Sequence, residues 1–353
     1  MEHLLRHRVL PCQPWLDFIV APNYLDGPGS LLIIRFSHAM ADGYSMMKLF
    51  FRLAGFDSLP PDVPQDKTTP VKFSLLNWLA HSKRLLTEGL TVYVRVWNSL
   101  PQNNIFRRGP LVVGVAEEVT GYWNCAITPQ FPLEKVTVAR KAFNTSFYGV
   151  VVSAVVGGLR EFARGQGWED ADLPDIVTTL LAMAKSNHPD GTLCNHWRPM
   201  ILDLPIGNGR DTISTLKDMH TLLESWKVST ASEFGTLILR LIELFPVFSR
   251  IDDILSFCGM TLISSITATA KNVPQVFGQT VEDVYHFMPI HRENIATLAW
   301  GSCSSNGHLR ISVTAEKIFF PRREHVYHLA DCIHQELNNM YELALERMKP
   351  KLD

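Results

Sequence analysis

The sequence lacks a strong net charge and any organised set of cysteines. Its 353 residues include 33 Lys and Arg against 35 Asp and Glu, which gives a formal net charge of −2. A nucleic-acid-binding protein needs a concentrated basic patch, so this balance argues against that class. None of the six cysteines forms a C-x-x-C pair, which predicts reduced thiols of an intracellular protein rather than a disulfide framework or a zinc site.

The sequence also lacks long hydrophobic runs. No stretch approaches the ~18 apolar residues that a membrane span requires. The N-terminus has no uninterrupted apolar core of signal-peptide length. The longest apolar candidate, Phe147 to Leu159, ends in Arg160-Glu161 and predicts a buried helix. With 46% hydrophobic and 19% charged residues there is ample material for a core, in two domains or one large one.

One stretch near the N-terminus presents chemically useful residues between two regular elements. Residues 31–36 form a short apolar run that predicts a buried strand, and residues 44–53 have the apolar spacing of a helix. Between them, Ser37-His38-Ala-Met-Ala-Asp42-Gly43 places a histidine at the end of the strand. Enzymes hold reactive groups on such loops, because rigid elements on both sides fix them.

The H-x-x-x-D-G pattern fixes only three positions and has a structural alternative. In that interpretation Asp42 caps the helix, Gly43 supplies a tight turn and His38 is merely adjacent. Helix caps and turns are commoner than active sites, so the short motif alone does not decide between the two.

The remaining pattern predicts a mixed α/β chain. A strand at residues 15–20 is expected to pair with residues 31–36 as a hairpin. Further helices are predicted at residues 73–96, 131–142, 148–164, 216–227 and 324–348. Further strands are predicted at residues 111–115, 122–127, 198–205, 295–303 and 309–314, the last two joined by a turn at 304–307. A proline-rich linker is expected at 57–70, and residues 101–110 are expected to end the preceding helix at a domain boundary.

The predicted helix at residues 73–96 has a basic amphipathic pattern, with Lys83 and Arg84 among its polar positions. Such a helix can lie on a membrane surface. Packing against its own domain is the commoner alternative, and the sequence leaves both open.

The order of these segments resembles the wax ester synthase/diacylglycerol acyltransferase family. Pro14-Trp15-Leu-Asp-Phe-Ile resembles the family's strand before the active-site hairpin, and Ser37-His38-Ala-Met-Ala-Asp42-Gly43 resembles its H-H-x-x-x-D-G signature. The stretch from Leu133 through Arg160 resembles the two helices opening its second half, and Gly207-Asn208 resembles its Gly-Asn dipeptide. Lys271-Asn272-Val-Pro274, followed by Gly278 and Pro289, resembles its N-V-P-G-P region. The resemblance runs from about residue 8 to residue 345.

Three departures from the family pattern stand out. Ser37 replaces the first histidine of the signature, Phe147-Tyr148 replaces an Asn-Asp pair, and Gln275-Val276 replaces Gly-Pro. Family members also begin well before the first matching strand. We therefore expect the first domain to be incomplete, as in a fragment, an alternative product or a diverged copy.

The resemblance implies a two-domain chloramphenicol-acetyltransferase-like sandwich of α/β class. Residues 1–110 would form a partial N-terminal domain carrying the HxxxDG loop, and residues 111–353 the C-terminal domain. His38 would be the general base for direct acyl transfer, since an unperturbed histidine titrates near cellular pH. Asp42 would hold the loop and the imidazole, and Gly43 would leave space for substrate. Ser37 and Asn272 are oxyanion-donor candidates by position only.

The implied activity is transfer of a long-chain acyl group from acyl-CoA to a fatty alcohol or diacylglycerol, giving wax ester or triacylglycerol. No cofactor is implied beyond acyl-CoA as co-substrate, and no metal, because His325 and His328 lack further ligands. Lipid substrates imply work at a membrane or lipid-droplet surface, such as the endoplasmic reticulum or plasma membrane.

Two other interpretations stay open. The chain could be a non-catalytic or truncated relative that binds lipid or acyl-CoA, which the missing front strand, Ser37 and Phe147-Tyr148 favour. A plant-type alcohol acyltransferase is the weaker alternative, because the D-F-G-W-G element of those enzymes is absent. The stretch Gly207-Asn208-Gly209 is interpreted as a turn, since neither phosphate-binding glycine pattern is present.

Overall fold

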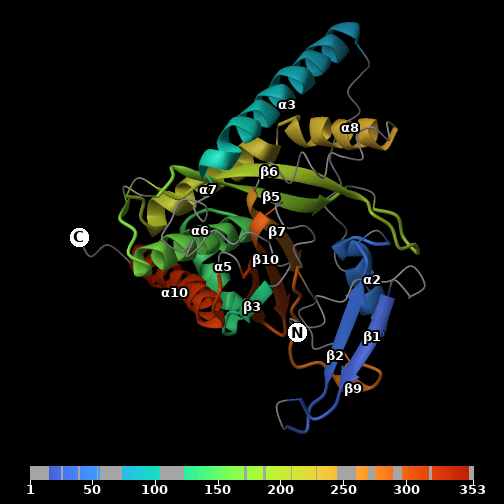
Figure 1. Ribbon diagram of the computed structural model, residues 1–353, viewed down its shortest axis with the longest axis vertical. Coiled ribbons are helices and arrows are strands. Elements are labelled where there is room, and N and C mark those ends of the chain that lie inside the picture. The colour runs from blue at the N-terminus through green and yellow to red at the C-terminus, as the bar shows by residue number, and fades with distance from the viewer. Residues whose placement is uncertain are drawn as a thin grey trace.

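The structure is a computed structural model in which a large mixed sheet, a helical layer and a small hairpin unit are arranged around one another (Figure 1). It describes residues 16–24, 27–38, 40–53, 55, 74–103, 123–170, 173–185, 188–207, 209–227, 229–244, 260–268, 275–288, 296–317 and 320–349. The predicted linker at 57–70, the predicted strand at 111–115 and the 110/111 domain boundary lie outside these residues.

The hairpin unit consists of β1 (Leu16–Ala21), β2 (Leu31–Phe36) and α2 (Gly43–Leu53), which confirms the predicted hairpin and helix. The two strands are antiparallel, and Asp17 lies opposite Arg35, with which it forms an ion pair. The expectation that β2 is a buried strand is wrong: all six of its residues are only partly buried. Within the described residues β2 pairs with β1 alone.

A seven-stranded mixed sheet forms the centre of the molecule. Along the sheet the order is β3, β11, β10, β7, β5 and β6, with β4 added to β11. The strands are β3 (Trp123–Ile127), β11 (His308–Glu316), β10 (Ala296–Ser305), β7 (Met260–Ala268), β5 (Ile176–Ala184), β6 (Trp197–Pro205) and β4 (Phe131–Pro132). The predicted strands at 122–127, 198–205, 295–303 and 309–314 are confirmed as β3, β6, β10 and β11. The predicted hairpin turn contains Asn306 and Gly307 with φ of 49° and 78°, as two-residue hairpin turns require.

Four helices cover one face of this sheet (Figure 1). They are α5 (Leu133–Ala142), α6 (Phe147–Gly165), α7 (Thr212–Lys227) and α10 (Arg323–Met348). The predicted buried helix is confirmed as α6, whose residues from Gly149 to Arg160 are all buried. A methyl group on Gly158 would lie 2.7 Å from the Cα of Ile333, so this glycine sets how closely α6 approaches α10.

Two further helices lie beyond the β6 edge of the sheet. α3 (Leu75–Asn103) packs against α8 (Ala231–Leu244), and its N-terminal end projects away from the body (Figure 1). α3 runs past the expected end of this helix, so Pro101 lies in its last turn rather than beyond it. Proline has a helical φ and removes one backbone hydrogen bond, a small loss at a helix end.

The hairpin unit also meets the segment that contains β8 (Gln275–Val276) and β9 (Gln279–Thr280). Tyr24 follows β1, and Tyr285 follows β9. Burial, together with a hydrogen bond to Tyr24, raises the pKa of Tyr285 to about 12. This contact ties the hairpin unit to the body at its far end.

Within the described residues, no single helix is long and apolar enough to span a membrane. The pair α5 and α6, bent by 97° at their junction, passes by length and composition when taken together. Since α6 is buried against the sheet and α10, it has the character of a core helix.

Candidate active site

His38 lies directly after β2 and is exposed to solvent. The turn that carries it is closed by a hydrogen bond from the Met40 amide to the Ser37 carbonyl, at 3.0 Å. The side-chain amide of Asn195 donates to the His38 carbonyl at 2.5 Å. The indole of Trp197 meets the imidazole edge-on, with 6.3 Å between ring centroids. The histidine is therefore held at its backbone and along one side of its ring.

Asp42 is the buried anchor of the same turn, with 4% of its surface exposed. One carboxylate oxygen accepts the Ser45 amide at 2.8 Å, which caps the start of α2. The other accepts the His196 amide at 2.7 Å. The Nε2 atom of His188 lies 3.0 and 3.1 Å from the two oxygens.

These hydrogen bonds set the charge state of Asp42. Burial alone would raise the pKa of its carboxyl, but the bonds from Ser45, His196 and His188 outweigh burial and lower the pKa below its ordinary value. Asp42 is thus an ionised carboxylate inside the protein.

The distant partners of Asp42 come from one segment, the loop between β5 and β6, which we call the β5–β6 loop (residues 185–196). The carbonyl of Cys194 accepts the Asp42 amide at 3.1 Å and the Ser45 hydroxyl at 2.9 Å. The loop reaches over the start of α2 (Figure 1). The histidine turn is therefore assembled from two parts of the chain about 150 residues apart.

The same loop also holds the outer face of α2. The buried ammonium of Lys48 donates to the Pro189 carbonyl at 2.8 Å. Arg52 pairs with Asp190 at 3.0 Å near the surface. Together with the contacts of Asp42 and Ser45, these bonds fix α2 along its length.

The structure brings together some of the predicted site residues and leaves others undescribed. His38, Asp42, Ser37 and Gly43 lie within one turn, as expected. Nothing lies within 4 Å of a Cβ built on Gly43, so open space adjoins the start of α2. Asn272 lies outside the described residues.

Asp42 does cap α2, as the structural alternative predicts, but its carboxylate also makes other contacts. The cap to Ser45 uses one oxygen, and the carboxylate also binds His188 and the His196 amide. Gly43 has no positive φ and is the first residue of α2.

Sequence reasoning missed the β5–β6 loop. The run Cys194-Asn195-His196-Trp197, directly before a predicted strand, was the available signal, because four chemistry-bearing side chains in succession are unusual in a loop. His188 had no local signal beyond a following proline.

Gly207, the glycine of the expected Gly-Asn segment, lies shortly after β6. Gly207 is buried, and a Cβ there would lie 2.5 Å from the Pro174 carbonyl oxygen. A glycine is therefore required for close backbone approach. Asn208 lies outside the described residues.

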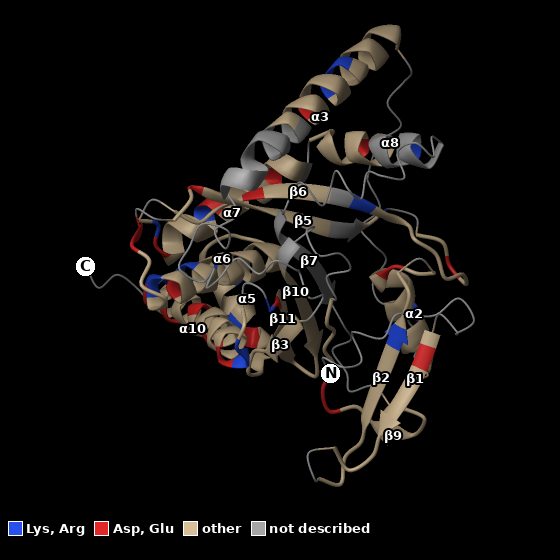
Figure 2. Cartoon of the chain, viewed as in Figure 1, with Lys and Arg blue, Asp and Glu red and all other residues tan. Residues whose placement is uncertain are grey.

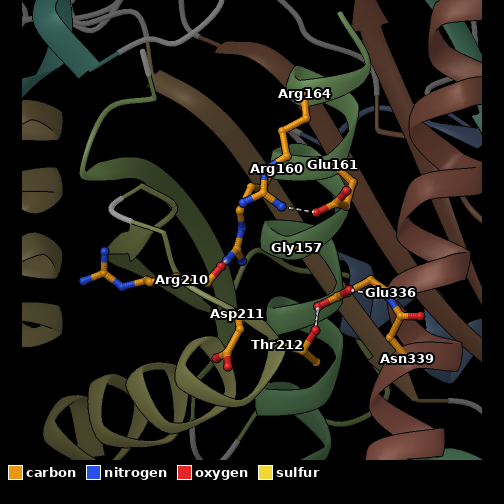
Figure 3. A pocket seen from close by; sticks show the side chains of 9 residues that line it. All are labelled: Gly157, Arg160, Glu161, Arg164, Arg210, Asp211, Thr212, Glu336 and Asn339. Carbon is orange, nitrogen blue, oxygen red and sulfur yellow. Dashed lines mark hydrogen bonds and ion pairs between the residues drawn. The ribbon is translucent and has the colours of Figure 1, made fainter. Parts of the chain in front are cut away.

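A separate cavity of about 200 Å³ lies among α6, α10 and the start of α7, on the helical side of the sheet (Figure 3). Its lining includes Arg160, Arg164 and Arg210. Each of these cations binds within the protein: Arg160 to Thr215 at 2.8 Å, Arg164 to Asp170 at 2.8 Å and Arg210 to Asp218 at 2.9 Å. Burial lowers the pKa of Arg160. The cavity is thus walled by an internal ion network and is separate from the histidine turn.

Together, the mixed sheet, its helical layer and the histidine turn define a chloramphenicol-acetyltransferase-like fold of the condensation type. The wax ester synthase/diacylglycerol acyltransferase from Marinobacter aquaeolei VT8 is similar over 97% of this chain and 74% of its own, with a TM-score of 0.59 and 15% identity. The epimerization domain of tyrocidine synthetase B is similar over 95% and 73%, with a TM-score of 0.53 and 13% identity. The cyclization-docking bidomain of EpoB from Sorangium cellulosum matches over 96% and 65%, with a TM-score of 0.55 and 13% identity.

Residues 193–341 match the family model of the WS/DGAT C-terminal domain. The match begins inside the β5–β6 loop and ends in α10, so it includes the loop residues Cys194, Asn195 and His196. The resemblance inferred from the sequence is thereby confirmed. In sequence, no curated protein matches the chain.

Proposed function

We propose that the protein is an O-acyltransferase that moves a long-chain fatty acyl group from acyl-CoA to a fatty alcohol or diacylglycerol. The WS/DGAT C-terminal domain supports the acyltransferase class. The observation that carries the proposal at the level of chemistry is the histidine turn, where His38 is exposed beside open space at Gly43. The products are a wax ester or a triacylglycerol.

His38 acts as the general base in this proposal. Its imidazole takes the proton from the acceptor hydroxyl as the oxygen attacks the thioester carbonyl. The C–S bond then breaks, and the imidazolium returns the proton to the departing CoA sulfur. No covalent enzyme intermediate forms, and the step needs no cofactor beyond acyl-CoA. Ser37 and Asn272 are the proposed donors to the oxyanion.

Asp42 supports the base without reacting itself. Its carboxylate caps α2 and binds the β5–β6 loop, whose Asn195 donates to the His38 carbonyl. Trp197, the first residue of β6, contacts the His38 ring. A catalytic group must be held close to its productive geometry, and these contacts do so.

A direct assay tests this function. Purified protein is incubated with radiolabelled palmitoyl-CoA and either hexadecanol or diacylglycerol, and the ester is counted after extraction. The proposal predicts ester from at least one acceptor. Absence of ester with both acceptors, from protein that is folded by circular dichroism, would overturn it.

The second candidate function is a non-catalytic relative that binds lipid or acyl-CoA. Ser37 favours it, because the family signature has a histidine at this position. In that case palmitoyl-CoA binds, but no ester forms, and His38→Ala leaves the binding unchanged.

We further propose that α3 rests on a membrane or lipid-droplet surface, such as the endoplasmic reticulum or the plasma membrane. One face of α3 packs on the protein: Gly89 is buried against the Phe234 ring, and Glu88 accepts the Thr230 amide at 2.9 Å. The opposite face exposes large apolar side chains, with Leu76 at 77% and Leu79 at 50%. The other members of this face are Leu75, Leu86, Leu90 and Val94.

The few charges of α3 suit such a contact. Lys83 and Arg84 are the described cations of the helix, and Figure 2 shows that charged residues are far denser over α5, α6 and α10. A helix with an apolar face and flanking cations lies in the interface of anionic lipids. This arrangement would deliver lipid acceptors to the enzyme.

A further inference from the structure

The His188 side chain is almost completely buried at the junction of the histidine turn and the β5–β6 loop. It is 1% exposed, and its partner Asp42 is 5% exposed. The Nε2 atom faces the Asp42 carboxylate, and the Nδ1 atom lies 3.2 Å from the Pro189 carbonyl oxygen. Both ring nitrogens thus face oxygen acceptors, an arrangement that only the doubly protonated imidazolium satisfies with two donors.

The other groups that face His188 complete its environment. The Tyr44 ring lies edge-on at 4.8 Å and the His196 ring at 5.5 Å between centroids. The Lys48 ammonium, which also donates to the Pro189 carbonyl, lies over the Tyr44 ring at 5.1 Å. The described surroundings therefore place one carboxylate directly against the ring, and this carboxylate is Asp42.

We propose that His188 is a positioning residue for acyl transfer, whose Nε2 atom holds the Asp42 carboxylate and, through it, the orientation of the His38 turn. The inference rests on the proposed function of His38. Its physical reason is that removing one partner of a buried polar contact leaves the other partner uncompensated. Without His188, Asp42 is free to turn toward solvent, which would loosen its bonds to Ser45 and His196 and let the turn move.

Two substitutions separate positioning from simple filling of space. His188→Gln places an amide near the position of Nε2, within reach of Asp42. His188→Asn places its amide near the position of Nδ1, toward the Pro189 carbonyl, and loses the contact with Asp42. Both are smaller than histidine, so loss of packing alone would affect them similarly.

The experiment measures kcat, the KM for palmitoyl-CoA and amide hydrogen exchange at Ser45 and His196. Displacing a reacting group by about 1 Å costs on the order of 10²-fold, so kcat of His188→Asn is expected to fall by about that factor, with a KM change below about threefold. His188→Gln should recover about tenfold of this loss. Because the two residues act as one unit, adding Asp42→Asn to His188→Asn should lower kcat by less than about twofold more.

His81→Gln is the matched control, because His81 forms the same kind of pair with Glu233 at 3.2 Å but is 53% exposed. It should leave kcat and both exchange rates unchanged. Equal kcat values for His188→Asn and His188→Gln, or a full additional loss in the double variant, would overturn the positioning role. If the wild-type chain forms no ester, the proposed function fails, and hydrogen exchange still decides the role of His188. Unchanged exchange in His188→Asn would then overturn it.

Discussion

At the scale of single residues, Asp42 joins the histidine turn to the β5–β6 loop. Its two oxygens accept hydrogen bonds from the Ser45 amide at the start of α2 and from the His196 amide, and they contact the Nε2 atom of His188. A helix cap is worth about 1 kcal/mol, and breaking a buried ion pair costs about 3–5 kcal/mol. One short side chain therefore joins the start of α2 to two groups of the β5–β6 loop.

Removing this carboxylate should destabilise the protein measurably. We expect Asp42→Ala to lower the free energy of unfolding by about 3 kcal/mol, because three hydrogen bonds are lost and His188 is left without its anion. Urea unfolding followed by tryptophan fluorescence measures the change. The control, Asp218→Ala, removes a 43% exposed carboxylate paired with Arg210 and should cost below about 1 kcal/mol. Equal losses in the two variants would contradict this role of Asp42.

The lowered pKa of Asp42 gives this contribution a defined pH dependence. In the folded state the carboxyl has a pKa below its unfolded value, so its stabilisation is fully present above about pH 4, the unfolded range. The stabilisation is lost as the pH falls through the folded pKa. The stability difference between wild type and Asp42→Asn should therefore shrink as the pH falls below about pH 4. A difference that grows below about pH 4 would have the wrong sign.

His38 and Asp42 could be predicted from the sequence, whereas their partners could not. The first two belong to a local pattern, a strand followed by a turn and a helix, which a reader can recognise in a single stretch. His188 and His196 reach Asp42 across 146 and 154 residues. Such contacts depend on how β5 and β6 are placed in the sheet, which local periodicity does not encode.

At the scale of elements, the long periodic segments were predicted and the central strand β5 was not. α6 and α10 have strong helical periodicity, and the β10–β11 hairpin has its turn residues. β5 pairs with strands on both sides, β6 and β7, and its apolar run shows no alternation. A short apolar run of this kind is ambiguous between strand and buried helix.

The contact between α6 and α10 offers a test at this scale. We expect Gly158→Ala to lower the free energy of unfolding by about 2 kcal/mol, because the new methyl group meets the Ile333 backbone and outweighs the gain of about 1 kcal/mol in helix propensity. Gly29→Ala is the control, since nothing lies within 4 Å of a Cβ there. Thermal unfolding of both variants measures the effect. A stabilised Gly158→Ala would contradict the close helix approach.

At the scale of the whole molecule, α3 gives the protein an asymmetric surface. The core residues gather between the large sheet and the helices α5, α6, α7 and α10, while α3 projects with an apolar face uncovered by described residues (Figure 1). The sequence left open whether this helix packs on its own domain or meets a membrane. One face of α3 packs on α8, and the other face is exposed.

Partition to liposomes tests the membrane proposal. Trp78 and Leu79 are 54% and 50% exposed near the projecting end of α3. We expect replacement of both by Gln to weaken binding to anionic liposomes by about tenfold or more, since each buried apolar side chain is worth about 1.5–3 kcal/mol. The matched control replaces Phe18 and Val20, which are 45% and 63% exposed on β1. Unchanged partition of the α3 variant would retire the proposed contact.

The most direct test of the account compares His38→Ala with the wild type in two measurements on the same preparations. Isothermal titration gives the dissociation constant for palmitoyl-CoA, and the radiolabelled assay gives the rate of ester formation. General-base catalysis contributes about 10²–10⁴-fold, so we predict a rate loss in that range with a dissociation constant changed by less than about threefold. A variant that retains more than about a tenth of the wild-type rate would contradict the assignment of His38 as the base.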